Sequence, residues 1–255
     1  MLTLDPTRHR GFAAATDALS DKVILITGAG SGIGRQAALS CAAHGAQVIL
    51  AGRTVARLEQ VYDEIVAAGG SEPMLYPVDM EGADSDDYQQ LAALLESHYD
   101  KLDGLLLNAG ILGTRTPFSH HRSDVWERVM KVNITAQWLM TQALLPVLEL
   151  STAGSVVFTS STVGHVAKPF WGAYGVSKFA LEGLAASWAE ELKAVSAVRV
   201  NVINPGATRT DMRAQAYPAE DPGELATPLA IMPSYLFLLS DASIGITGVR
   251  LDAQG

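Results

Sequence analysis

The sequence predicts one α/β domain, built on a doubly wound parallel sheet of about seven strands with helices on both faces. Short runs rich in valine, isoleucine and leucine recur along the chain, and their weak polar alternation predicts strands buried on both faces. Helix-forming stretches separate these runs, as crossovers between parallel strands require. The runs are KVILIT (22–27), AQVILA (46–51), MLYPV (74–78), LDGLLL (102–107), GSVVFTS (154–160), VRVNVI (198–203) and VRLD (249–252).

Four of the intervening stretches carry clear helix signals. The stretch 34–45 ends at Gly45, a typical residue just after a helix, and the stretch 54–70 begins at Thr54, a candidate N-cap. A long helix is predicted over 123–150, with Pro146 near its end, and another over 173–193. Because no linker or repeat interrupts the pattern, we predict a single domain over 1–255.

Two segments lie outside the repeating pattern. Residues 1–20 precede the first strand and form an N-terminal extension. Residues 210–228, between the sixth strand and the last helix, are rich in proline, alanine and acidic residues. A segment of this length beside the ends of the strands predicts a lid over a substrate site.

Composition narrows the class of protein. The 255 residues are 48% hydrophobic and carry a formal net charge of −9, which argues against nucleic acid as the main partner. Cys41 is the only cysteine, so no internal disulfide is expected. No apolar run is long enough to span a membrane. We expect a cytoplasmic protein that does not enter membranes. We expect no metal site, because His120 and His121 are adjacent rather than spaced as ligands.

A glycine-rich turn follows the first predicted strand. It contains Gly28, Gly30, Gly32 and Gly34. The usual G-x-G-x-x-G pattern fails, because Ile33 or Arg35 stands where its last glycine should be. A glycine turn that leads into a helix exposes backbone N–H groups to a phosphate. The turn therefore predicts nucleotide binding, with a purely structural β–α turn as the alternative.

The second predicted strand ends in LAGRT, residues 50–54. Domains that bind NAD place Asp or Glu about 20 residues past the glycine turn, on the ribose 2′-hydroxyl. Gly52 and Arg53 stand here instead, and the next acidic residue is Glu59. A guanidinium without a competing carboxylate favours a 2′-phosphate. We predict that NADP(H) is preferred, with Arg53 on its phosphate and NAD(H) possible. The alternative is that Arg53 projects into solvent.

The segment GAYGVSKFA places Tyr174 and Lys178 four residues apart on a helix, and therefore on one face. An ammonium about 5 Å from a phenol favours the phenolate by about 3 kcal/mol at an effective dielectric constant near 20. We therefore expect Lys178 to lower the pKa of Tyr174 toward acid–base chemistry at neutral pH. Ser161 lies thirteen residues before Tyr174, just after a predicted strand.

These motifs together resemble the short-chain dehydrogenase/reductase family over essentially the whole chain. The turn reads T-G-x-x-x-G-I-G, with Ser31 inside it, and matches through Thr27, Gly28, Gly32, Ile33 and Gly34. The strings around Tyr174 and Pro205, with the DAQG ending, resemble the YciK-like branch of its bacterial oxidoreductases. The resemblance implies a Rossmann-type fold and hydride exchange with a carbonyl or alcohol substrate.

The resemblance also implies a catalytic tetrad. Tyr174 would exchange a proton with the substrate, and Lys178 would hold the nicotinamide ribose. Ser161 would bind the carbonyl, and Asn133 would support a water relay. The adjacent Ser160 and Thr162 are alternative hydroxyl groups, and a structural role inside the helix is the alternative for Asn133.

The remaining implied cofactor contacts follow the third, fourth and sixth strands. Asp79 and Met80 would meet the adenine, although Asp79 could equally cap a turn. The family's N-N-A-G string appears here as L-N-A-G, so its first asparagine is replaced by Leu107. The expected contacts are Asp79, Met80, Asn108, Ala109, Gly110, Pro205, Gly206, Thr208 and Thr210.

The sequence leaves the substrate open. Candidate pocket residues are Ile111, Leu112, His165, Phe170, Trp171 and Met212. The family implies a homodimer or homotetramer, with the helices at 123–150 and 172–193 as candidate contact faces. A non-catalytic nucleotide-binding regulator or scaffold on the same fold is the alternative function, and the tetrad argues against it.

Overall fold

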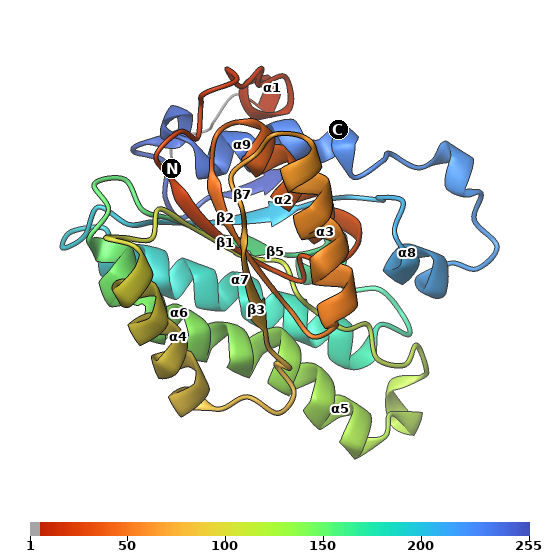
Figure 1. Cartoon of the computed structure of the whole chain (residues 1–255). Helices are drawn as coiled ribbons and strands as arrows, with labels where there is room; N and C mark the ends of the chain where they lie inside the picture. The colour runs from red at the N-terminus through yellow and green to blue at the C-terminus, as the bar shows by residue number, and fades with distance from the viewer. Residues whose placement is uncertain (1–5) are drawn as a thin grey trace.

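A computed structural model describes residues 6–255. Its seven strands form one parallel sheet in the order β3-β2-β1-β4-β5-β6-β7, which confirms the predicted doubly wound architecture (Figure 1). Every predicted strand is present, and its bounds differ from the prediction by two residues or fewer. The strands are β1 Val23–Thr27, β2 Gln47–Gly52, β3 Met74–Pro77, β4 Gly104–Leu107, β5 Ser155–Thr159, β6 Arg199–Asn204 and β7 Arg250–Asp252.

Helices cover both faces of the sheet (Figure 1). Residues of α4, α6 and α7 pack on one face, and residues of α2, α3 and α9 pack on the other. The α-helices are α1 Pro6–Arg10, α2 Gly32–Ala43, α3 Val55–Ala67, α4 Ser85–His98, α5 Ser123–Met130, α6 Ala136–Glu149, α7 Gly172–Leu192, α8 Asp211–Ala216 and α9 Met232–Leu239. Short turns are the π-helical η2 Lys131–Thr135 and the 3-10 helices η1 Phe118–His120, η3 Thr162–Gly164, η4 Pro222–Glu224, η5 Leu229–Ile231 and η6 Asp241–Ser243.

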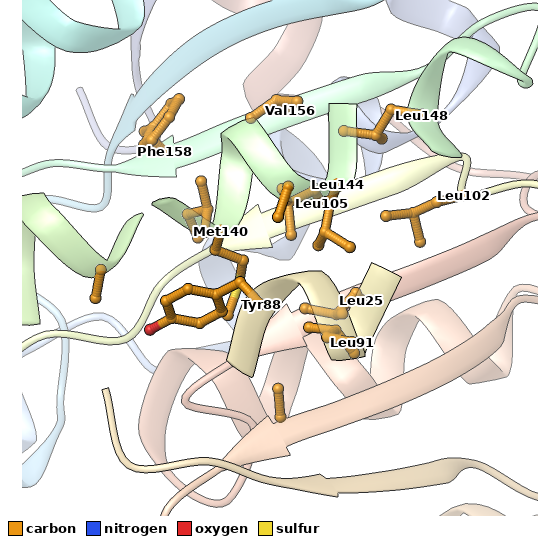
Figure 2. Close-up of a cluster of buried hydrophobic side chains, with 14 of the residues drawn as sticks. Leu25, Tyr88, Leu91, Leu102, Leu105, Met140, Leu144, Leu148, Val156 and Phe158 are labelled. Carbon is orange, nitrogen blue, oxygen red and sulfur yellow. The ribbon is translucent and has the colours of Figure 1, made fainter. Parts of the chain in front are cut away.

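The core on the α4, α6 and α7 side contains two of the largest buried side chains, Tyr88 and Phe158 (Figure 2). Tyr88 of α4 and Phe158 of β5 are fully buried and lie on either side of Met140 from α6. Leu105, from the central strand β4, belongs to the same cluster. Because strands of this kind are covered on both faces, their side chains show no alternation, as the sequence pattern indicated.

The predicted long helix over 123–150 is continuous but not uniform. A π-helical turn, η2, joins α5 to α6, and Pro146 lies inside α6 near its end, as predicted. A π-turn inserts one residue into the helical repeat and rotates the side chains that follow it. This turn carries Asn133, which the sequence placed in a regular helix.

The N-terminal extension is tied to the C-terminal part of the fold. The His9 imidazole bonds to the Ser234 hydroxyl at 2.9 Å, and Arg10 Nε donates to the carbonyl oxygen of Asp252 at 2.9 Å. Phe12 meets Phe237 of α9 edge to face. Residues 1–5 of the predicted extension lie outside the described residues. Between residues 6 and 255, no helix has the length and apolar character needed to cross a membrane.

Asp103 joins three parts of the fold at the start of β4. Its carboxylate accepts hydrogen bonds from the Val23 amide at 2.9 Å and the Ser151 hydroxyl at 2.6 Å. It also pairs with Lys101 at 2.8 Å, and it is 2% exposed. Replacement Asp103→Ala would leave the Val23 amide and the buried Ser151 hydroxyl without this acceptor, so we expect unfolding in urea to show a loss of about 2–4 kcal/mol.

Asp100→Ala, on an exposed carboxylate three residues away, is the matched control for this substitution. It should change stability by less than about 0.5 kcal/mol. Equal losses in the two variants would show that the Asp103 hydrogen bonds do not stabilise the joint between β1 and β4.

Candidate active site

A cleft of roughly 650 Å³ opens at the carboxyl ends of the strands, where the strand order reverses between β1 and β4. Ligands bind at this place in doubly wound sheets, because the loops there diverge. Of the predicted site residues, only Gly34 and Asn133 do not line it. The predicted residues that line the cleft are Gly28, Gly30, Ser31, Gly32, Ile33, Arg53, Asp79, Met80, Asn108, Ala109, Gly110, Ser161, Tyr174, Lys178, Pro205, Gly206, Thr208 and Thr210.

The glycine turn has the close packing that a phosphate-binding turn needs. Gly28 has φ +68°, and a Cβ on Gly34 would lie 2.3 Å from the carbonyl oxygen of Gly28. Gly34 therefore lies beneath the turn, where it allows β1 and α2 to approach each other. Ser31, the N-cap of α2, makes no side-chain capping hydrogen bond. The first amides of α2 are thus free of a protein cap and fit the pyrophosphate of a dinucleotide.

Thr27 fastens the turn to the end of β4. Its hydroxyl accepts hydrogen bonds from the amides of Asn108 at 2.9 Å and Ala109 at 3.0 Å. The Asn108 side chain donates back to the Thr27 carbonyl at 3.3 Å. Leu107 is fully buried in the core, so the residue that departs from the family's string serves packing. Asn108 therefore holds the two sides of the cleft together.

Arginines gather at the end of β2. Arg53 and Arg57 line the cleft and are exposed, and Arg35 lines it while paired with Glu64 of α3. The sequence interpretation named only Arg53, because Arg57 lies a full helical turn further on. Asp79, at the same end, accepts a hydrogen bond from the Glu81 amide at 3.2 Å, so it does cap a turn as well as line the cleft.

Tyr174 and Lys178 lie together at the base of the cleft. Their side chains come from the same face of α7, and Lys178 Nζ lies 5.7 Å from the centroid of the Tyr174 ring. Tyr174 is 8% exposed and Lys178 is 3% exposed. Ser161 lies close enough to the Tyr174 phenol to lower the pKa of that group. Ser160 donates instead to Glu182, at 2.6 Å, which leaves Ser161 as the hydroxyl beside the phenol.

Asn133 lies one layer behind the cleft. Its side-chain oxygen accepts a hydrogen bond from the Ile111 amide at 2.9 Å, and its amide group donates to the Ile111 carbonyl and the Ser177 hydroxyl, each at 3.0 Å. A Cβ on Gly110 would lie 3.3 Å from Asn133 Oδ1 and 3.7 Å from Lys178 Nζ. Asn133 and Lys178 thus flank Gly110, and the π-turn sets the direction of the Asn133 side chain.

Comparison with known proteins identifies the family. A family model described as short chain dehydrogenase matches residues 22–221. The chain belongs to the short chain dehydrogenase family. It is also similar to the uncharacterized oxidoreductase YciK of Escherichia coli K12, with 49% identity over 238 residues that cover 93% of this chain and 94% of YciK.

Two solved structures of related short chain dehydrogenases contain the phosphorylated cofactor. One, from Shigella flexneri, is complexed with NADP and has a TM-score of 0.92 and 48% identity over 94% of this chain and 100% of its own. The other, from Escherichia coli CFT073, is complexed with NADPH and has a TM-score of 0.92 and 49% identity over the same shares. The predicted fold and family are therefore confirmed.

Burial dominates the ionisation of the Tyr174 and Lys178 pair in this short chain dehydrogenase. Burial raises the pKa of Tyr174 to about 12, and Ser161 opposes that rise only in part. The expectation that the pKa of Tyr174 is lowered toward neutral pH is therefore wrong for the protein without cofactor. Burial also lowers the pKa of Lys178 to about 8, although the Glu182 carboxylate raises it in part. The charged form of this lysine is therefore less favoured than that of an ordinary lysine. Its Nζ donates to the Thr159 carbonyl at 2.7 Å.

His121 supports the start of the helix that carries Tyr174. The Ala173 amide donates to His121 Nε2 at 3.3 Å, and Trp171, the N-cap of α7, makes no side-chain capping bond. A Cβ on Gly172 would lie 2.3 Å from the imidazole, so only glycine fits there. The sequence interpretation missed this contact, because 52 residues separate its two partners and no local pattern indicates it.

Gln254 holds the loop after β6. Its side-chain amide donates to the carbonyls of Pro205 at 2.7 Å and Ala207 at 3.0 Å. A Cβ on Gly206, where φ is +70°, would lie 3.0 Å from the same amide. Gln254 belongs to the DAQG ending that carries part of the family resemblance, and in the structure it supports part of the cleft.

The predicted pocket residues divide into two groups. Trp171, Met212 and the pair Ile111 and Leu112 line the cleft, as expected. The expectation is wrong for His165, whose side chain is 66% exposed and lies outside the cleft. It is also wrong for Phe170, which is 54% exposed and lines a separate surface hollow.

The buried lysine makes stability depend on pH. An ordinary lysine pKa of 10.5 falls to about 8 in the folded chain. Below pH 8 both states hold the proton, and between pH 8 and 10.5 the unfolded chain holds more protons, so stability contributed at this site rises with pH. Between pH 7 and 10.5, we expect wild type to gain about 3 kcal/mol relative to Lys178→Met, measured by denaturant unfolding without cofactor.

The matched control is Lys193→Met, because the Lys193 side chain is 62% exposed. The difference in stability between Lys193→Met and wild type should stay nearly constant between about pH 7 and 10.5. If the two variants gave the same pH dependence, burial of Lys178 would not be the cause.

Proposed function

We propose that this protein is an NADP(H)-dependent oxidoreductase that interconverts a carbonyl and an alcohol, with Tyr174 as the general acid and base. The proposal rests mainly on one observation. The buried phenol of Tyr174, its Ser161 partner and Lys178 lie in the same cleft as the glycine turn. A nucleotide-binding scaffold has no need for a matched set of proton-transfer groups beside the nucleotide site.

The protein's own groups serve proton transfer and positioning. Tyr174, with a pKa of about 12, is protonated at neutral pH and can donate a proton to a carbonyl oxygen. Ser161 orients that oxygen through its hydroxyl, and Lys178 supplies a positive charge beneath the phenol. The bound nicotinamide would supply or accept the hydride. Asn133, through Ile111 and Ser177, fixes the backbone around Lys178.

The preference for NADP(H) is part of the proposal. Arg53 stands at the end of β2, where a carboxylate would exclude a 2′-phosphate, and Arg57 lies beside it. The relatives from Shigella flexneri and Escherichia coli CFT073 were solved with NADP and NADPH, which supports the same preference here. The implied adenine and carboxamide contacts, from Asp79 to Thr210, belong to the proposal on the same grounds.

Three wider features complete the proposal. Residues 1–255 form one domain, and residues 210–228 act as a lid, because Met212 and Ala216 line the cleft from α8. The single cysteine, Cys41, allows no internal disulfide and so supports a cytoplasmic location. A homodimer or homotetramer would use the faces of α5, α6 and α7, where Trp138 and Phe179 are exposed.

Removing the phenolic hydroxyl tests the proposed chemistry. We expect Tyr174→Phe to lower kcat by about 100-fold or more, because proton transfer loses its donor while the ring packing stays. NADPH oxidation would be followed against aldehydes, ketones and quinones, with NADPH affinity measured separately.

Tyr62→Phe is the control, because Tyr62 lies on α3 and does not line the cleft. If NADPH binds but no carbonyl is reduced by the wild type, the scaffold function is correct instead. Unchanged turnover in Tyr174→Phe would refute the assigned role of the phenol.

Cofactor choice is tested by Arg53→Ala. We expect NADPH affinity to fall about tenfold or more, because a charge-assisted contact with the 2′-phosphate is lost, while NADH affinity stays within about twofold. Calorimetry with both cofactors makes the measurement, and Arg122→Ala, on a 76% exposed arginine outside the cleft, is the control. If NADPH and NADH bind with similar affinities, and Arg53→Ala changes neither affinity, the proposed preference for NADP(H) is contradicted.

A further inference from the structure

The cleft beside Tyr174 has an apolar wall. Leu112 from the loop after β4, Trp171 at the start of α7 and Ala216 of α8 are buried against Tyr174, and Met212 packs on them. All four of these side chains also line the cleft. We use the term apolar wall for Leu112, Trp171, Met212 and Ala216.

One cation, Arg213, lines the cleft beside this wall. Its guanidinium is already occupied by a carboxylate: Nε donates to Glu220 at 2.6 Å and Nη2 donates at 2.5 Å. It also stacks 3.9 Å from the centre of the Tyr217 ring. Arg213 lowers the pKa of the Glu220 carboxyl group, so the pair stays ionised at neutral pH. A two-point contact of this kind leaves little of the arginine for a ligand.

The other nearby cations are also engaged or turned away. Arg115 lies 4.8 Å over the Trp171 ring and 4.9 Å over the Tyr217 ring, donates to the Ala216 carbonyl and does not line the cleft. Arg209 lines the cleft, yet donates to the carbonyls of residues 223 and 225. Lys178 donates to the Thr159 carbonyl beneath the phenol.

An anionic substrate would therefore lose its hydration against the apolar wall beside an arginine, Arg213, whose charge Glu220 already neutralises. Burying a charge without a partner is unfavourable, whereas an uncharged ring gains from contact with Trp171 and Leu112. The ion pair between Arg213 and Glu220 therefore determines whether this part of the cleft disfavours or favours an anionic substrate. Without Glu220, Arg213 would be the cation that an anionic substrate needs.

We infer that the substrate is an uncharged carbonyl or alcohol compound with a compact apolar body, and that Glu220 excludes anionic analogues by occupying Arg213. The inference rests on the proposed function for its reacting carbonyl. The apolar wall contacts the body of the substrate, and Glu220 acts through Arg213 as a specificity-determining residue.

The test uses two ketones of the same size, 4-oxocyclohexanecarboxamide and 4-oxocyclohexanecarboxylate, with NADPH. In wild type we expect kcat/KM for the amide to exceed that for the carboxylate by about 30-fold or more. Glu220→Gln should reduce this ratio about tenfold, mainly through a lower KM for the carboxylate. The double variant Arg213→Gln with Glu220→Gln should lose that gain, because the freed cation is gone.

Glu96→Gln, on an exposed glutamate of α4, makes the same change in net charge away from the cleft and should leave the ratio unchanged. A wild type that reduces both ketones equally, or a ratio that Glu220→Gln does not alter, overturns the inference. Thermal unfolding of each variant shows that the comparison is made between folded proteins.

Calorimetric binding of the same two ketones to the NADP⁺-loaded protein separates this inference from the proposed function. Selective binding of the amide, relaxed by Glu220→Gln, with no turnover of either compound would refute the proposed reaction and uphold the charge selection. Binding of neither ketone, or equal binding of both, would refute the charge selection itself.

Discussion

The cleft depends on the close contact between the carboxyl ends of β1 and β4. Thr27 provides this contact, because its hydroxyl accepts hydrogen bonds from two backbone amides at the start of the loop after β4. Directly beneath, Gly34 leaves room for the Gly28 carbonyl that a larger residue would displace. This joint holds the side of the cleft with the glycine turn in register with the side that carries Asn108 and Ala109.

Burial gives the same side chains their chemical character. Tyr174 and Lys178 lie side by side and are buried, and burial favours the neutral form of each side chain over its charged form. Glu182 and the Thr159 carbonyl offset part of this effect for the lysine. The ionisation of this pair thus depends on its surroundings as much as on its spacing along α7.

Local patterns in the sequence were sufficient for the fold and for most of the cleft. Strands buried on both faces show as continuous apolar runs, and parallel order then brings their carboxyl ends to one edge, where Ser161 and the glycine turn meet. Spacing along one helix placed Tyr174 near Lys178. It could not give the direction of the pKa shift, because that shift comes from burial by distant segments.

Contacts between distant segments were the part that the sequence could not show. His121 reaches the Ala173 amide across 52 residues, and Gln254 reaches the loop at 205–208 from the far end of the chain. The π-turn at Asn133 has no propensity signal, since its residues suit an ordinary helix equally well. Each of these features depends on which surfaces the finished fold presents to one another.

The order of strands has a consequence for synthesis. β1 lies inside the sheet and pairs with both β2 and β4. Its partner β4 is far along the chain: Asn108, just after β4, lies 81 residues beyond Thr27, the last residue of β1. While the ribosome is still making that interval, one side of β1 is an open row of backbone donors and acceptors. Such an unpaired edge can pair with other chains, so the emerging polypeptide is open to misassociation until the fourth strand has been made.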